Sequence, residues 1–195
     1  MRHTKQSELL MAQFMREIGL DPDKDENLKD TPVRFSKMIC ELTRNYKTEP
    51  KFVDKVNYDS HKEIKSTVFS AEGADELVIV RDISVSSICG HHLMPFFGTM
   101  HIGYLPKDKI IGLSKLGRIA DYYCARPQTQ EYLTEQVATC LMKQTDARFV
   151  GVVMHAVHTC MSCRGAKKIG ATTITSKFMP NDMKETKVEF LNLVR

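Results

Sequence analysis

ELVIVRDISVSS, residues 76–87, is where the sequence turns from helical to strand-forming patterns, and this change decides the fold class. The stretch is rich in β-branched residues, which favour strands. FFGTMHIGYL (96–105), FVGVVMHAVHTC (149–160) and ATTITSKF (171–178) predict three more strands. Two helical patterns, 114 to about 124 and 129 to about 144, separate the second strand from the third. The order ββααββ predicts an α+β fold in which helices cover one face of an antiparallel sheet.

The first 66 residues have a different pattern. Residues 4–19 predict an amphipathic helix whose apolar face carries Leu9, Leu10, Phe14 and Ile18. A second helix is expected from about residue 31 to about residue 46, because Pro32 suits a first helical turn. Residues 47–66 are polar and mixed, as in a linker. We therefore predict an N-terminal helical region and linker over 1–66 and a main domain over 67–195.

The composition is that of an ordinary globular protein, with 195 residues, 42% hydrophobic and 27% charged. The net charge of +4 suits an anionic ligand but is too small to indicate nucleic acid. No stretch approaches the roughly 18 apolar residues of a membrane span, and LLMAQFM near the start is interrupted by Gln13. We expect a cytoplasmic protein, with neither nucleic acid nor membrane as a partner, whose six cysteines are reduced or bind metal.

Two clusters of cysteine and histidine indicate a metal site. CGHH (89–92) supplies Cys89 and His92, and HTCMSCRG (158–165) supplies His158, Cys160 and Cys163. Thiolate and imidazole together suit zinc. Cys89, His92, Cys160 and Cys163 would close a four-ligand structural site, whereas three ligands would leave the open position that a catalytic zinc needs. Spacing alone does not separate these alternatives.

Several ordered blocks resemble the GTP cyclohydrolase I family, of the zinc-dependent type IA. These blocks are DTPVRFSKM (30–38), SICGHHLMPFFGTMHIGYLP (87–106), IGLSKLGRIA (111–120), RPQTQEYLT (126–134), HAVHTCMSCRG (155–165) and EFL (189–191). The resemblance implies the tunnelling fold (T-fold), in which subunits join antiparallel sheets into rings. Two such rings usually stack as a homodecamer, with active sites at subunit junctions. It also implies zinc-dependent hydrolysis of GTP at C8 of its imidazole ring, giving formate and 7,8-dihydroneopterin triphosphate.

The resemblance also assigns roles to residues. The implied zinc ligands are Cys89, His92 and Cys160, which leaves Cys163 as a bystander. The implied proton-transfer residues are His91 and His158. The implied substrate-binding residues at the guanine are Glu131, which is the anchor, and Gln130 beside it. The implied contacts to the rest of the substrate are Ser114, Lys115, Arg118, Arg164, Arg34 and Lys37, the last two reaching a neighbouring subunit's site.

One residue departs from the family pattern. The family has Cys-Glu-His-His, whereas this chain carries Gly90 in place of the glutamate. Loss of a carboxylate beside a ligand can alter rate, metal affinity or substrate preference. Because the three implied ligands and both implied proton-transfer histidines remain, we expect retained activity. Gly90 is the one feature that points to an alternative, a catalytically weakened or silent relative that binds zinc and nucleotide.

Two further alternatives carry less weight. A structural zinc module that binds nucleic acid would need Cys163 as a ligand, and Glu131 would oppose phosphate binding there. A nitrile reductase of the same fold, acting on a deazaguanine, uses a cysteine nucleophile and does not need this ligand set.

Overall fold

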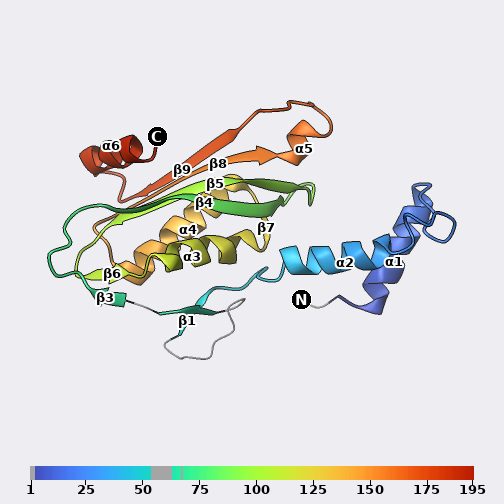
Figure 1. Cartoon of the computed structure of the whole chain (residues 1–195), viewed down its shortest axis with the longest axis horizontal. Coiled ribbons are helices and arrows are strands. Elements are labelled where there is room, and N and C mark those ends of the chain that lie inside the picture. The colour runs from blue at the N-terminus through green and yellow to red at the C-terminus, as the bar shows by residue number, and fades with distance from the viewer. Residues whose placement is uncertain (1–2, 54–62, 67) are drawn as a thin grey trace.

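A five-stranded sheet forms the centre of the molecule (Figure 1). The computed structural model describes residues 3–53, 63–66 and 68–195. The strand order is β7-β4-β5-β8-β9. The four long strands run antiparallel to their neighbours, and β7 pairs in parallel with the end of β4. Their bounds are β4 Val78–Cys89, β5 Pro95–Leu105, β7 Pro127–Gln128, β8 Phe149–His158 and β9 Thr173–Met179.

Helices cover both faces of this sheet, which explains why β8 is apolar along most of its length. Helices α3 (Ser114–Cys124) and α4 (Gln130–Thr145) pack on one face, over Val150, Val152 and Met154. Helix α6 (Lys184–Leu193) lies on the opposite face (Figure 1). There its Phe190 packs with Phe149. The predicted ββααββ order and the mixed α and β fold class are confirmed. The prediction that helices cover only one face was wrong, because Phe190 packs α6 onto the second face (Figure 1).

The N-terminal helices form an arm that projects from the body (Figure 1). Helix α1 (Lys5–Glu17) starts with a capping box between Thr4 and Ser7. Helix α2 (Thr31–Leu42) ends four residues earlier than expected. There the Thr43 hydroxyl donates to the Ile39 carbonyl at 2.7 Å, and the Asn45 amide donates to the Tyr122 carbonyl at 3.1 Å. Side-chain bonds to the backbone and to α3 therefore replace the last helical turn.

The predicted apolar face of α1 is on the surface of the single chain. The exposed fractions of Leu9, Leu10, Phe14 and Ile18 are 55%, 56%, 56% and 55%. Isolated exposed apolar residues are ordinary, but several on one helix mark a surface that binds something.

The segment predicted as a linker contacts the body. It contains a parallel pair of short strands, β1 (Lys51–Val53) and β2 (Glu63–Lys65), and Ile64 is only 2% exposed. Strand β3 (Val68–Ser70) then pairs with β6 (Lys109–Ile111). Residues 54–62 and 67 lie outside the described residues, and so does part of the boundary predicted between 66 and 67.

The length and polarity of the helices are relevant to the prediction that the protein has no membrane partner. Among residues 3–53, 63–66 and 68–195, no helix combines the length and apolar character that crossing a bilayer requires.

Candidate metal centre

The last residue of β4 and the turn after it carry two of the predicted metal ligands. Cys89 ends the strand, and its N–H donates to the Met94 carbonyl at 2.8 Å. Leu93 adopts a left-handed backbone with φ 53° and donates its N–H to the Cys89 carbonyl at 2.8 Å. This closed turn folds His92 back over Cys89, so that Nδ1 of His92 lies 3.7 Å from Sγ of Cys89.

The third predicted ligand, Cys160, follows strand β8 in the same sheet. Strand β8 pairs with β5, and it leads directly into the short helix α5 (Thr159–Ser162), which carries Cys160. The Thr159 hydroxyl donates to the Pro95 carbonyl at 2.5 Å and ties this helix to the start of β5. As a result, the ligand atoms of Cys89, His92 and Cys160 all lie within 4.8 Å of one another.

This donor set fits a tetrahedral zinc ion. At ordinary Zn–S and Zn–N bond lengths, a thiolate and an imidazole on one tetrahedral ion lie about 3.6 Å apart, close to the observed Cys89–His92 separation. Burial, and then the adjacent Cys89 thiol, raise the pKa of Cys160. A divalent cation would offset that effect by stabilising both thiolates. In the part of the chain that the structure describes, Cys163 does not join the group.

His158 and the start of α4 stand beside this cluster. The His158 ring stacks on Phe96, with centroids 4.5 Å apart and planes 7° from parallel. Burial lowers the pKa of His158, while the carboxylate of Glu131 acts in the opposite direction. Glu131 therefore lies close enough to act on the imidazole charge.

The first residue of α4 is enclosed. Gln130 is 1% exposed, and its Oε1 lies 2.7 Å from Nε2 of His158. Glu131, next to it, is exposed to solvent. The two neighbours thus face different surroundings, although the resemblance implied that both bind the substrate.

Two more predicted residues lie at the same end of the sheet. His91 is exposed, and its ring centroid is 6.2 Å from that of His92. Arg164 is in the loop after α5, and its charge partly opposes the rise in the pKa of Cys160 that burial and Cys89 cause, so the guanidinium lies near the cluster. The structure therefore gathers Cys89, His91, His92, Glu131, His158, Cys160 and Arg164.

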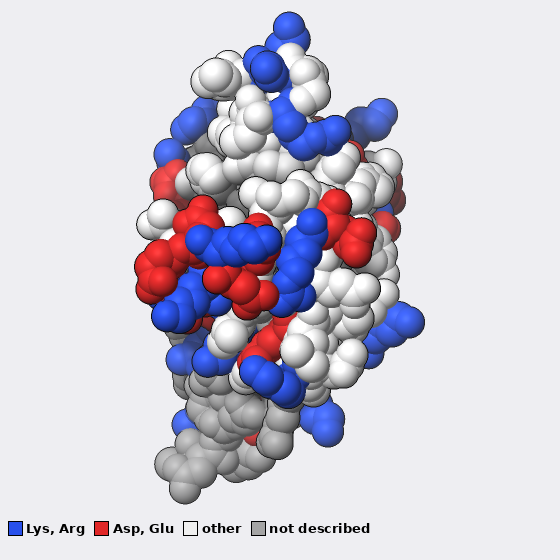
Figure 2. Space-filling view, turned by 90° about the vertical axis from the view of Figure 1, so that its right-hand side faces the viewer, with Lys and Arg blue, Asp and Glu red and all other residues white. Residues whose placement is uncertain are grey.

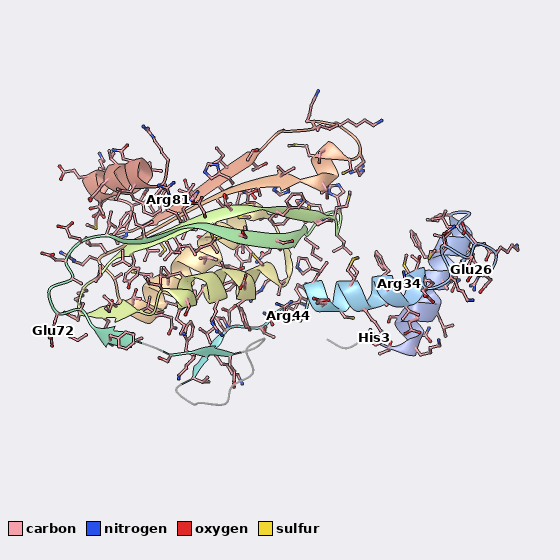
Figure 3. All side chains as sticks on the ribbon, viewed as in Figure 1. His3, Glu26, Arg34, Arg44, Glu72 and Arg81 are labelled. Carbon is pink, nitrogen blue, oxygen red and sulfur yellow. The ribbon has the colours of Figure 1, made fainter. Side chains whose placement is uncertain are left out.

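The remaining predicted substrate contacts do not join them within one chain. Ser114, Lys115 and Arg118 are on α3, which begins beside β6, at the end of the sheet away from α5 (Figure 1). Lys115 is only 7% exposed, and burial, followed by the charge of Arg118, lowers its pKa. Figure 3 shows Arg34 on the projecting arm, where it pairs with Asp30 at 3.0 Å. Lys37 is also exposed on that helix.

A cavity on the α3 side is lined in part by Arg44, a basic residue that the sequence did not predict as a site residue. It has a volume of about 690 Å³ and is lined by Arg118, Arg44 and Asp121 among others, but by none of the metal ligands. Nε of Arg44 is buried without a hydrogen-bond partner in the described structure. No motif could have indicated Arg44, because its position depends on where α2 ends.

The charge distribution bears on the nucleic-acid alternative. Figure 2 shows acidic and basic side chains interleaved over the middle of the face that carries the N-terminal arm, and mainly basic side chains at its top. A nucleic-acid surface would need basic side chains clustered along a face.

Comparison with known proteins gives the family. The family model for GTP cyclohydrolase I matches residues 7–195. The chain belongs to the GTP cyclohydrolase I family. GTP cyclohydrolase 1 of Saccharomyces cerevisiae is 45% identical over 182 residues, covering 93% of this chain and 70% of the yeast protein. The enzyme of Coxiella burnetii strain RSA 493 is 42% identical over 180 residues, covering 91% of each chain.

One further relative and one solved structure are similar to the chain. GTP cyclohydrolase 1 of Sulfurihydrogenibium sp. strain YO3AOP1 is 41% identical over 184 residues, covering 93% of this chain and 89% of the relative. The apo crystal structure of the archaeosine synthase QueF-Like covers 52% of this chain and 91% of its own, with a TM-score of 0.42 and 15% identity. That likeness is too low to support an argument. The relatives and the family model confirm the GTP cyclohydrolase I resemblance.

Proposed function

We propose that the chain is a zinc-dependent GTP cyclohydrolase I. It hydrolyses the imidazole ring of GTP at C8, releases formate and forms 7,8-dihydroneopterin triphosphate. One observation carries the proposal: Cys89, His92 and Cys160 converge within 4.8 Å. His158 and Glu131 at the same end of the sheet support it, as does membership of the family.

Cys89, His92 and Cys160 would hold the zinc ion. When bound, zinc would supply a nucleophile near neutral pH, because it lowers the pKa of coordinated water to about 7. Three protein ligands would leave room for that water, as a catalytic site requires and a four-ligand structural site does not. The absence of Cys163 from the described ligand group supports this open form.

The other groups at this end select and activate the purine. The carboxylate of Glu131 accepts hydrogen bonds from N1–H and the exocyclic amine of guanine, a charge-assisted pair. Its exposure at the start of α4 leaves it available. His91 acts as the general acid at N7, and His158 transfers a second proton. Positioned proton transfer typically contributes a factor of about 10² to 10⁴ in rate.

The triphosphate is bound by cations from more than one subunit. Arg164 lies near the metal centre of its own chain, whereas α3 and α2 place their cations elsewhere. We therefore assign Ser114, Lys115, Arg118, Arg34 and Lys37 to the site of a neighbouring subunit. The ring assembly of the T-fold, as a homodecamer, would bring them together. The single chain supports this with an edge strand, β9, and the exposed apolar face of α1.

The free thiols support a cytoplasmic location for the reaction. All six cysteines are free, and two of the three zinc ligands must remain reduced to bind metal. A cytoplasmic location keeps thiols reduced and therefore suits this site.

The experiment supplies the purified protein with zinc and GTP and measures both formate and the fluorescence of oxidised neopterin. We expect both products in equal amounts from GTP and none from ATP, since adenine lacks the N1–H and amine pair that Glu131 recognises. Glu131→Gln should lose most of the activity while keeping its zinc. The proposal fails if wild-type protein yields no formate at any zinc load.

A further inference from the structure

The side-chain amide of Gln130 has its orientation set by the backbone of two strands. Its Nε2 lies 3.1 Å from the carbonyl oxygen of Met154 on β8 and 3.0 Å from that of Thr173 on β9. A carbonyl oxygen only accepts hydrogen bonds, so the end of the amide facing both must be the NH₂ group. Both amide hydrogens of Gln130 are therefore used within the chain.

This orientation determines the proton position on His158. With its NH₂ group facing the strands, Gln130 presents Oε1 to the imidazole, at 2.7 Å from Nε2 of His158. Because an amide oxygen only accepts, Nε2 of His158 must carry the hydrogen. In the neutral ring, Nδ1 then keeps its lone pair.

We propose that Gln130 is a positioning residue that holds His158 as the Nε2–H tautomer. Nδ1 is thereby kept as the proton acceptor that the reaction needs. This inference rests on the proposed function, in which His158 transfers a proton. It gives Gln130 a different role from the guanine contact that the resemblance implied.

The surroundings keep the pair in place. The stacked Phe96 ring packs against the imidazole. Behind Gln130, the Thr134 hydroxyl donates to the Gln130 carbonyl at 2.8 Å, and Thr175 lies 2.7 Å from that hydroxyl. Because Gln130 is 1% exposed, water has little access to replace the amide.

The first test measures the tautomer directly. Isotope-edited Raman spectroscopy on the zinc-loaded protein separates the two neutral imidazole tautomers, and a His158→Gln variant identifies the signal of His158. We expect the Nε2–H form in the wild type and its loss or mixing in Gln130→Met. Gln128→Met is the matched control, because Gln128 is also a buried amide that donates twice, to Tyr123 and Gln136. It should leave the His158 signal unchanged.

The second test uses kinetics to separate positioning from binding. Gln130→Met should lower kcat by about 10²-fold. Its KM for GTP should stay within about twofold, because no substrate contact is removed. In the His158→Gln background the same substitution should have no further effect on kcat, since the two residues act as a unit.

Specific outcomes would overturn the proposal. An Nδ1–H tautomer in the wild type contradicts it, and that measurement needs no substitution and so does not depend on how Gln130→Met folds. A raised KM with unchanged kcat in Gln130→Met would instead assign Gln130 to guanine binding. If wild-type protein makes no formate, the proposed function fails, while the Raman comparison still decides the role of Gln130.

Discussion

Gly90 lies between two metal ligands, at the position where the family pattern has glutamate. Its φ is outside the left-handed region, and a Cβ built on it would meet the Gln128 carbonyl oxygen at 3.5 Å, an ordinary contact. Its N–H donates to that same oxygen at 2.8 Å. The backbone of the turn therefore does not need glycine, and a Cβ at this position would make only ordinary contacts with the Gln128 backbone.

Gly90→Ala should leave the zinc site intact and raise the stability of the protein. Alanine restricts the unfolded chain more than glycine does, which typically adds about 0.4–1 kcal/mol to the free energy of unfolding where the native backbone is compatible. Thermal unfolding and bound zinc per chain are the measurements. A lower midpoint or lost zinc would show that the turn depends on glycine.

A cysteine and histidine cluster that could bind metal was predictable from residue type, whereas its membership was not. The resemblance implied Cys89, His92 and Cys160, but spacing alone equally allowed a four-ligand site with Cys163. Only the folded turn and the short helix α5 show that Cys163 is exposed and outside the group. The contact between Gln130 and His158 was not predictable, because it depends on two strand carbonyls far away in the chain.

At the scale of elements, β5 is the strand on which the site depends. It pairs with β4 and with β8, and both partners lead to residues of the Cys89, His92 and Cys160 cluster. Gly98 in β5 allows the close approach of β8. A Cβ there would overlap the carbonyl oxygen of His155 and come within 2.7 Å of the Ala156 Cα. Backbone atoms cannot move aside as the end of a flexible side chain can.

Gly98→Ala should therefore destabilise the protein by about 1–3 kcal/mol or more, because β5 and β8 must separate. Gly117→Ala, in α3, is the matched control, since the nearest atom to its added Cβ is Ile83 Cγ2 at 4.0 Å. The control should gain up to about 1 kcal/mol from helix propensity. Chemical denaturation of both variants is the measurement, and equal effects would contradict the packing argument.

Long patterned elements could be predicted, and short elements that depend on distant partners could not. Helix α3 begins and ends where its pattern predicted, at Ser114 and Cys124. The three-residue strands β1, β2, β3 and β6 have too few residues to show a period, and pairing with distant segments determines them. Helix α6 packs Phe190 against the sheet. The seven-residue segment VEFLNLV was too short for its pattern to predict this helix.

At the scale of the molecule, the projecting arm is a surface that a single chain leaves uncovered. The apolar side chains of α1 are more than half exposed, and the cations of α2 lie away from the metal centre of the same chain. Both features are explained if the arm packs against other subunits. The arm would then complete neighbouring sites while it buries its apolar face.

Phe14→Glu should weaken that assembly without unfolding the chain. Phe14 is 56% exposed, so the substitution removes little contact within one subunit, but it would bury a charge between subunits. Gln13→Glu adds the same charge on the adjacent exposed position and serves as the control. Sedimentation velocity should show smaller particles for Phe14→Glu alone. Unchanged particles would mean that α1 does not contribute to the interface.

The central claim is that three ligands hold one zinc ion which the hydrolysis of GTP requires. The most direct measurement titrates chelator-treated protein with zinc while formate release from GTP is followed. We predict that formate release is absent without metal, rises with added zinc and saturates at one zinc per chain. Formate release that is independent of zinc, or absent at every zinc load, would contradict this account.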